Sequence, residues 1–234
     1  MKPSQEWIEN FVAVAKDPTR TDVIFKVITA PEILTEDALN ILIEKVKKDP
    51  KGSVLLRDRY EKPWKVADLA TYPENTFAYA YARHMIDNGL DADFFDKVPG
   101  DSEGAYLQFR MRNVHDIWHA LTGFTTSVPD EVGLQAFQIA QLRSRSSGVI
   151  SSMLLMHGVL FDLDEMNDTC AAFAQGFTMG KNATLIVGEK FEENWHRDLE
   201  EYRRELGIVA LKPAAVKRPS AMKMGMGHEH AQTV

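Results

Sequence analysis

The segment 101–142, DSEGAYLQFRMRNVHDIWHALTGFTTSVPDEVGLQAFQIAQL, decides the fold. Its apolar residues recur every three or four positions, which is the spacing of one face of a helix and not of a strand. Gly123 and Pro129 interrupt the pattern, because glycine favours a helix end and proline favours the first turn of a helix. We therefore predict a helix over 101–124 and a second helix from Pro129 to Leu142, joined by a short loop.

The rest of the chain has the same helical periodicity. Thr35 is a predicted N-cap, and Gly89 is predicted to close a helix in a left-handed conformation. Residues 51–73 are less regular, and no alternating strand pattern or internal repeat is visible. The further helices are predicted over residues 7–17, 36–48, 74–88, 147–160, 163–187 and 189–206. The sequence thus predicts an all-α, single-domain, multi-helix bundle.

Domain organisation follows from composition. The chain has 234 residues and 44% hydrophobic residues, enough for one sizeable core. We assign residues 1–211 to the helical domain, and we predict that residues 212–234, which are rich in Met, Pro, Ala and Lys, form a disordered tail. The first 211 residues carry 23 basic and 33 acidic side chains, a net charge of -10. Such a surface repels a phosphate backbone, which makes nucleic acid a poor partner.

The compartment and membrane class are constrained by three features. Cys170 is the single cysteine, so no intrachain disulfide can form, and its Ala-rich apolar surroundings predict a buried thiol. The N-terminus has neither a secretory signal pattern nor an Arg-rich transit peptide. The longest apolar stretch, 149–161, is too short to span a bilayer. We expect a protein that is cytoplasmic or peripheral to the inner face of a membrane.

A metal-binding pattern lies within the segment that decides the fold. His115, Asp116 and His119 are followed by eleven residues and then Glu131. On a helix, positions i and i+4 lie about 40° apart and one turn along the axis, so both imidazoles can face one ion. Asp116 is rotated by about 100° from His115, at the edge of that arc. Glu131 falls in the first turn of the next helix, which an antiparallel helix pair would bring to the same place.

The charges of these four groups favour a dication. Two neutral imidazoles and two carboxylates carry -2, which one divalent ion cancels. Mixed nitrogen and oxygen ligands suit zinc, manganese, iron or cobalt, and magnesium less well. The spacing by itself is equally compatible with a chance histidine pair. The metal site is favoured by the apolar neighbours Val114, Ile117, Trp118 and Leu121. They predict a helix that is otherwise buried in the core, where polar side chains need a reason to be present.

The sequence resembles the coenzyme Q biosynthesis protein 4 family. That family's signature is His-Asp-x-x-His, eleven residues and Glu, and the chain reproduces it without a gap. The likeness covers residues 25 to 208, with two departures: Asp130 stands where the family commonly has Gly, and Gly180-Lys181-Asn182-Ala183 replaces a segment with an Arg pair. The other residues that resemble the family are Phe77, Ala78, Tyr79, Ala80, Tyr81, Ala82, Arg83, residues 87–90, Tyr106, Arg112, Val114, Phe137, Ala140, Gln141, Glu193, Trp195, Leu206, Gly207 and Ile208.

This resemblance implies a metal- and prenyl-lipid-binding protein of ubiquinone or related prenylquinone biosynthesis. It implies that His115, Asp116, His119 and Glu131 hold the ion, and it links the family to oxidative decarboxylation and hydroxylation of a polyprenylated ring. The resemblance therefore leads us to expect an enzyme, whereas the amino-acid composition does not distinguish an enzyme from a binding protein. Arg110, Arg112 and Lys181 are predicted to pair with a carboxylate or phosphate of the substrate, although each can equally be a surface charge or a structural pair.

An isoprenoid substrate needs an apolar slot. Helices within 149–160 and 170–187 are apolar on more than one face, so they can line the slot, dock on a membrane or simply pack in the core. The expected partners are a polyprenylated quinone precursor or other isoprenoid lipid, other quinone-biosynthesis proteins, a membrane surface and a second copy of the chain.

Two other functions fit the same residues. The first is a non-catalytic lipid-binding scaffold that organises quinone-biosynthesis enzymes, in which the ion only orders two helices. The second is a metal-dependent phosphohydrolase of the type marked by His-Asp pairs. That class needs another His and Asp on separate helices, and His84 or His157 would have to serve. Neither histidine shows a matching partner pattern, so this function ranks below the other two.

Overall fold

The computed structural model describes residues 2–94 and 100–211. In these ranges the chain forms helices, with one isolated antiparallel bridge between Thr76 and Asp198. The all-α, single-domain prediction is confirmed, whereas the predicted tail 212–234 lies outside the described residues. The α-helices are α1 (Gln5–Lys16), α2 (Thr21–Ile28), α3 (Glu36–Lys47), α4 (Pro50–Asp58), α5 (Val66–Leu69), α6 (Phe77–Asn88), α7 (Glu103–Asn113), α8 (His115–Thr122), α9 (Val128–Leu142), α10 (Arg145–Phe161), α11 (Leu163–Asn182) and α12 (Leu199–Leu206), and the two 3-10 helices are η1 (Ile186–Gly188) and η2 (Phe191–Glu193).

Short polar side chains set most helix starts. Thr35 is the N-cap of α3, as predicted, and its hydroxyl accepts a hydrogen bond from the backbone N–H of Ala38. Ser127 does the same for α9, where Pro129 occupies the first turn. Gly89 ends α6 with a φ of 64°, also as predicted. These caps fix where the site-bearing helices begin and end.

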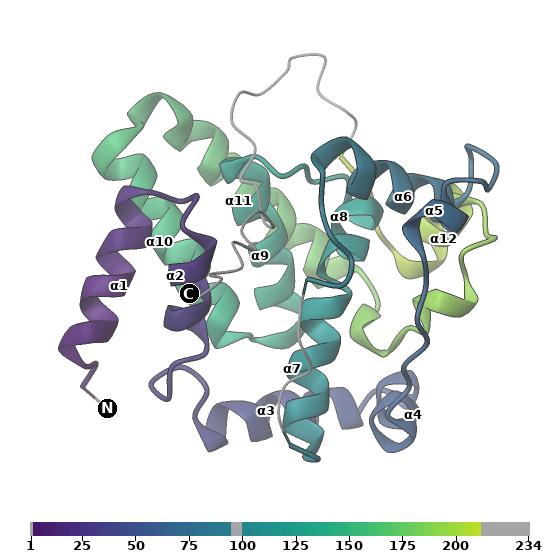
Figure 1. Cartoon of the computed structure of the whole chain (residues 1–234), viewed down its shortest axis with the longest axis horizontal. Coiled ribbons are helices and arrows are strands. Elements are labelled where there is room, and N and C mark those ends of the chain that lie inside the picture. The colour runs from purple at the N-terminus through teal and green to yellow at the C-terminus, as the bar shows by residue number, and fades with distance from the viewer. Residues whose placement is uncertain (1, 95–99, 212–234) are drawn as a thin grey trace, which may run out of the picture.

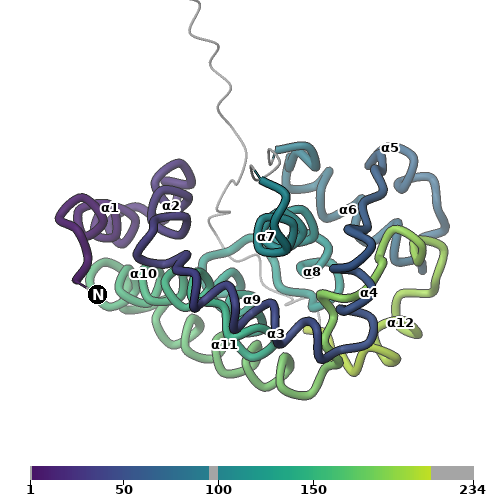
Figure 2. The backbone as a smooth tube through the Cα atoms, turned by 90° about the horizontal axis from the view of Figure 1, so that it is seen from below, coloured from purple at the N-terminus to yellow at the C-terminus, as the bar shows by residue number. Residues whose placement is uncertain are grey.

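The helices form two regions that share α9. In Figure 1, α10 lies beside α1 and α2, whereas α5, α6, α8 and α12 gather at the opposite end. In Figure 2, α9, α10 and α11 form one layer, and α2 and α7 lie above it in this view. Helix α11 packs along α9, and α8 packs between α6, α7 and α9. No helix among the described residues is long and apolar enough to cross a bilayer.

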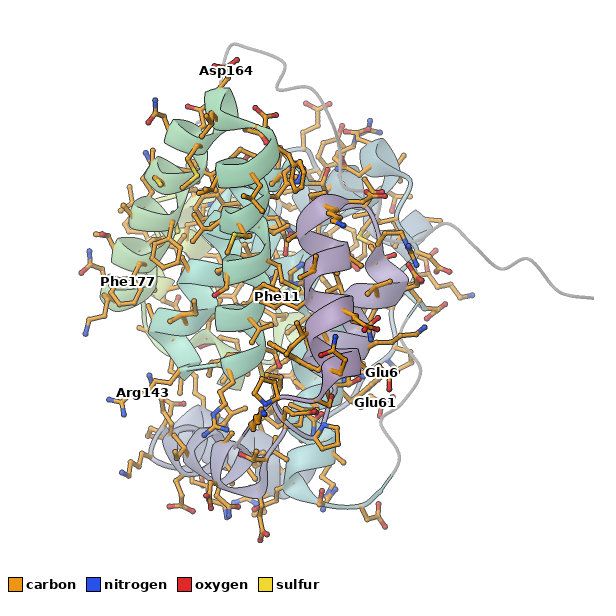
Figure 3. All side chains as sticks on the ribbon, turned by 90° about the vertical axis from the view of Figure 1, so that its left-hand side faces the viewer. Glu6, Phe11, Glu61, Arg143, Asp164 and Phe177 are labelled. Atoms are coloured by element: carbon orange, nitrogen blue, oxygen red, sulfur yellow. The ribbon has the colours of Figure 1, made fainter. Side chains whose placement is uncertain are left out.

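Two apolar clusters support this arrangement. The larger cluster surrounds α8 and includes Trp118, Phe137 and Tyr202, each of which is almost fully buried. The smaller cluster joins α1 and α2 to α9 and α10, with Val132 and Met153 completely buried. Phe11 packs against the smaller cluster and is visible in Figure 3 where α1 faces α10. The site described below lies where α9 meets both clusters.

The predicted helix over 101–124 is wrong in one respect, because it breaks at Val114. Helix α7 ends before this residue and α8 begins after it, and Val114 itself has a φ of −100° and a ψ of 5°. Neither glycine nor proline marks the break. Val114 is completely buried in the larger cluster, so we attribute the change of direction to tertiary packing, which overrides local propensity.

Three other predictions need correction. Residues 51–73 contain most of α4, because Asp49 caps a helix whose first residue is Pro50. The range 189–206 is helical mainly at Leu199–Leu206, and its first part forms η2 and irregular structure around buried Glu189 and Glu192. Cys170 is exposed, because α11 turns this side of its Ala-rich segment outward.

Helices α9 and α11 pack so closely at Gly176 that a larger residue there should destabilise the fold. A Cβ added at Gly176 of α11 would lie 1.8 Å from the backbone oxygen of Gly133 in α9, so the two helices would have to separate. We expect Gly176→Ala to lower the free energy of unfolding by about 2–4 kcal/mol. Gly148→Ala is the matched control, since nothing lies within 4 Å of its added Cβ; it should raise the stability by about 0.5–1 kcal/mol. Urea denaturation measures both, and equal effects would contradict the close α9–α11 contact.

Candidate metal centre

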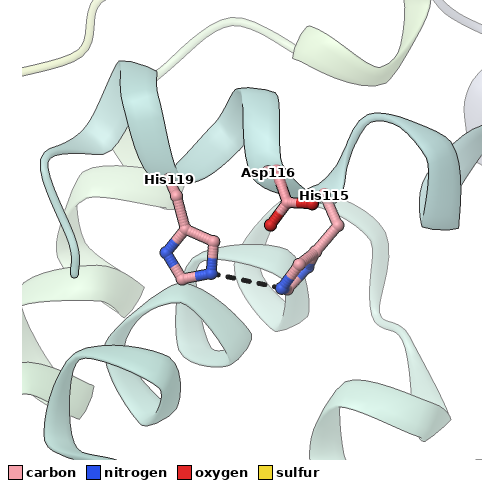
Figure 4. A group of neighbouring side chains, drawn as sticks. All are labelled: His115, Asp116 and His119. Atoms are coloured by element: carbon pink, nitrogen blue, oxygen red, sulfur yellow. Dashed lines mark hydrogen bonds between the residues drawn. The ribbon is translucent and has the colours of Figure 1, made fainter. Parts of the chain in front are cut away.

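The two histidines of the motif meet on one face of α8. The Nε2 atoms of His115 and His119 lie 3.2 Å apart, and their rings are nearly perpendicular, at 87° (Figure 4). Both residues are buried. The break at Val114 places His115 in the first turn of α8, so the pair still occupies positions i and i+4 of one helix. The two imidazole nitrogens therefore face one small volume inside the protein.

Glu131 reaches the same volume from α9. Its Oε2 lies 3.2 Å from Nε2 of His119, and its Oε1 lies 3.6 Å from Nε2 of His115. The Ser127 cap begins α9 four residues earlier, so the carboxylate stands in the first helical turn. Gln135, one turn later, donates a hydrogen bond from Nε2 to Oε1 of Glu131 at 2.6 Å. Helices α8 and α9 therefore bring together the carboxylate and the two imidazoles.

Asp116 completes a second group with the same histidines. Ligand atoms of His115, Asp116 and His119 all lie within 4.8 Å of one another. Asp116 is half-buried, and its Oδ1 lies 3.6 Å from Nε2 of His84, which comes from α6. Sequence reasoning considered His84 only for a hydrolase and did not place it here. No spacing in the sequence relates α6 to α8, so only the fold shows this contact.

Hydrogen bonds on the far side of each ring decide which nitrogen can bind an ion. Nδ1 of His119 lies 3.0 Å from the carbonyl oxygen of Phe124, which can only accept, so Nδ1–H donates and Nε2 keeps its lone pair. Nδ1 of His115 lies 3.2 Å from the side-chain amide of Gln138. That amide can face the ring with either its NH₂ or its oxygen, and Ser147 Oγ can bond with the other end. With the oxygen facing His115, Nε2 of that ring is also free.

The carboxylates are held in their ionised form. Burial opposes the ionisation of Glu131, but the imidazoles of His115 and His119 lower its pKa well below the usual value when protons rather than an ion occupy their Nε2 atoms. Burial likewise opposes ionisation of Asp116, and the nearby ring of His84 together with the histidine charges lowers its pKa. Burial lowers the affinity of His115 for a proton, but the charge of Glu131 outweighs it and raises the pKa. The site thus attracts positive charge, whether a proton or a cation.

These donors fit a divalent ion. With metal–ligand distances of about 2.0–2.1 Å, two ligands of a tetrahedral zinc site lie about 3.3–3.4 Å apart. Nε2 of His119 lies 3.2 Å from Nε2 of His115 and 3.2 Å from Oε2 of Glu131, close to that edge length, and the other oxygen of Glu131 lies 3.6 Å from Nε2 of His115. Two imidazoles and two carboxylates are ligands that zinc, iron, manganese and cobalt accept. The two histidines and a neighbouring carboxylate therefore fit such an ion.

A cavity of about 130 Å³ opens onto this site. Part of its wall is polar and includes His115, Glu131, Gln135 and Gln138. Its apolar walls come from α2, the 28–35 connection, α3, α7 and the start of α10, and include Ile24, Ile28, Ile33, Leu39, Leu42 and Ile150. Of the two ranges predicted to form a slot, 149–160 contributes Ile150 and 170–187, all of which the structure describes, contributes no lining residue.

The three predicted substrate-binding cations have different positions. Arg112 lines the cavity, is half-buried, and has a pKa lowered by burial, with no charge partner among the described residues. Arg110 points elsewhere and pairs with Glu192, both side chains being almost fully buried. Its guanidinium also donates to the carbonyl oxygen of Glu189 at 2.9 Å. Lys181 is exposed at the end of α11 and does not line the cavity.

Comparisons with known proteins agree with one another. Residues 7–212 match the family described as coenzyme Q (ubiquinone) biosynthesis protein Coq4. The chain is 37% identical to the mitochondrial ubiquinone biosynthesis protein COQ4 homolog of Nematostella vectensis over 201 residues, which is 82% of this chain and 94% of that protein. It is 32% identical to the mitochondrial coq4 protein of Botryotinia fuckeliana over 68% of this chain, and there it spans only 58% of the relative's length. A crystal structure from Nostoc punctiforme, described as that of a candidate ubiquinone biosynthesis protein, superimposes with a TM-score of 0.76 at 28% identity and covers 87% of this chain and 95% of that one.

The position of Arg110 predicts a structural role for its charge. We expect Arg110→Ala to lower the free energy of unfolding by about 3–5 kcal/mol, because it leaves Glu192 buried without its cation. Lys181→Ala, at an exposed position, should stay within about 0.5 kcal/mol of the unaltered protein. Guanidinium denaturation measures both. An Arg110→Ala variant that is fully stable yet loses ligand binding would assign Arg110 to the substrate instead.

Proposed function

The chain belongs to the Coq4 family of coenzyme Q (ubiquinone) biosynthesis proteins, and from this premise we propose that it binds one divalent ion and a prenylated ring precursor for oxidative decarboxylation and hydroxylation of that ring. One observation carries the proposal. The imidazoles of His115 and His119 and the carboxylate of Glu131 meet in one small volume, and His115 and Glu131 also line an apolar cavity. Side chains that can bind a metal ion thus lie next to apolar walls that can bind a lipid.

The ion would be held by His115, His119, Glu131 and Asp116. When bound, it supplies Lewis acidity toward substrate oxygens and, for a redox-active metal, a centre for reaction with dioxygen. Phe124 and Gln138 orient the two rings through Nδ1, and Gln135 orients Glu131. The surrounding apolar side chains exclude water and strengthen each of these electrostatic interactions.

The cavity suits an amphipathic substrate. Its apolar walls can bury isoprenoid units, at about 25 cal/mol for each Å² removed from water. Arg112 lines the same cavity and has no charge partner among residues 2–94 and 100–211, which favours an anionic group on the ligand. A ring carboxylate that pairs with Arg112 would lie in the same cavity as the metal ligands. Arg112 is therefore our substrate-binding residue, and the structural environments of Arg110 and Lys181 give them no comparable role.

A scaffold function is the second proposal. An ion bound by His115 and His119 of α8 and by Glu131 of α9 would also tie these helices together, so it can order a surface that a partner reads. Contact with other quinone-biosynthesis proteins, with a membrane or with a second copy of the chain belongs to this proposal. A phosphohydrolase is less favoured. Of the two histidines that could serve it, His84 lies against the site from α6, but Nδ1 of His157 lies 3.0 Å from the carbonyl oxygen of Ala15 at the α1–α10 contact. Among the described residues, the group of possible ligands contains no aspartate besides Asp116, whereas this class needs one on a separate helix.

Metal binding is the first prediction of this proposal. We expect the purified protein to bind about one zinc ion per chain, and His119→Ala to lose it, because a ligand nitrogen is removed from a buried site. His196→Ala, which changes an exposed histidine, is the control and should retain full occupancy. Elemental analysis after dialysis measures both variants. Full occupancy in His119→Ala would sink the proposed site.

Turnover is the second prediction. Protein loaded with a redox-active divalent metal such as iron(II) should convert a carboxylated polyprenyl phenol, dioxygen and water into the hydroxylated ring, carbon dioxide and hydrogen peroxide, with the ring product detected by mass. Arg112→Met should weaken binding of this substrate by about tenfold or more, since a charge-assisted hydrogen bond contributes about 1.5–3 kcal/mol. A substrate that lacks the carboxylate should bind equally well to both proteins. Tight lipid binding without turnover would favour the scaffold, and an unchanged affinity in Arg112→Met would remove Arg112 from the site.

A further inference from the structure

His84 lies against the candidate metal centre from a third helix. Its ring stacks on the ring of His119, with centroids 5.0 Å apart and planes 18° from parallel. Its Nε2 lies 3.6 Å from Oδ1 of Asp116. The side chain of His84 is 10% exposed, and Nε2 is buried without a hydrogen-bond partner. A buried ring nitrogen in this position is either a ligand or a donor that acts on a ligand.

The position of Nε2 argues against direct coordination. The ligand atoms of His115, Asp116 and His119 all lie within 4.8 Å of one another, and His84 does not belong to this group of the described residues. Its Nε2 instead faces Oδ1 of Asp116, so His84 would act on an ion through that carboxylate. Asp116, whose carboxylate has two oxygens, is the group between His84 and the site.

We propose that His84 is a positioning residue whose Nε2–H donates to one oxygen of Asp116 and so directs the other oxygen toward the ion. This inference rests on the metal binding of the proposed function. Such carboxylate–histidine pairs orient ligands and raise their basicity in metal sites. A hydrogen bond formed by shortening this 3.6 Å contact would also satisfy the buried nitrogen of His84, which is costly to leave without a partner.

The surroundings hold His84 in place. One turn later, Asn88 donates to the backbone oxygen of His84 at 2.8 Å and accepts from Thr126 Oγ1 at 3.0 Å. These bonds fasten the end of α6 to the loop that leads into α9.

The test is zinc affinity in a double-mutant cycle. His84→Phe keeps an aromatic ring against His119 but removes the donor, and we expect it to weaken zinc binding by about ten- to a hundredfold. In an Asp116→Ala background the same change should have little effect, because His84 acts through Asp116. His84→Gln, which retains an N–H donor, should recover most of the affinity. Competition titration of the full-length protein against a chromophoric chelator measures all five proteins.

Two further readouts separate positioning from folding. The melting temperature of metal-free His84→Phe should match that of the unaltered protein, and the visible spectrum of bound cobalt(II) should change, because it depends on the ligand geometry. An equal loss of affinity in both backgrounds would overturn the inference, as would unchanged affinity in His84→Phe. Failure of the unaltered protein to bind zinc or cobalt would overturn the proposed metal function as well, which distinguishes the two failures.

Discussion

Two ionised carboxylates and two imidazoles gathered inside an apolar bundle are the constraint on which this structure depends. Glu131 is almost fully buried, and the water it has lost must be replaced by partners. For Glu131 the fold supplies imidazoles from α8 and the side-chain amide of Gln135 on α9. For Asp116 it supplies the ring of His84 on α6. Helix caps and the close α9–α11 packing fix those elements in register. A divalent ion would balance the charges that remain.

The sequence predicts the helix pair that carries the site, because its signals are local. The i,i+4 histidines, the Ser127–Pro129 helix start and the apolar period all act within a few residues. The break at Val114 has no local signal, since it arises from packing of a buried side chain. The position of His84 and the walls of the cavity depend on contacts between elements far apart in sequence, so spacing gives no access to them. The cap at Asp49 and the first-turn proline at Pro50 are local signals for α4, although the glycine and prolines within 51–73 favour an irregular segment there.

Arg110 and Arg112 show why residue type alone does not assign a role. Residues that are two positions apart on a helix are rotated by about 200° from each other, so the guanidinium groups of Arg110 and Arg112 leave α7 on nearly opposite sides. Arg110 points into the larger core region, where Glu192 and the Glu189 carbonyl satisfy its charge. Arg112 points into the cavity that contains His115 and Glu131. On the same helix, Arg110 therefore stabilises the fold through Glu192, and Arg112 is positioned to bind a ligand in the cavity.

X-ray absorption at the zinc edge of the loaded protein tests the central claim most directly. The account predicts a first shell of nitrogen and oxygen atoms at about 2.0–2.1 Å, with outer-shell scattering from two imidazole rings and none from sulfur. The His119→Ala variant would show one ring or no bound zinc. A spectrum without imidazole scattering, or one that requires three coordinated rings, would contradict the assignment of His115 and His119 as the histidine ligands and of His84 as a residue outside the first shell.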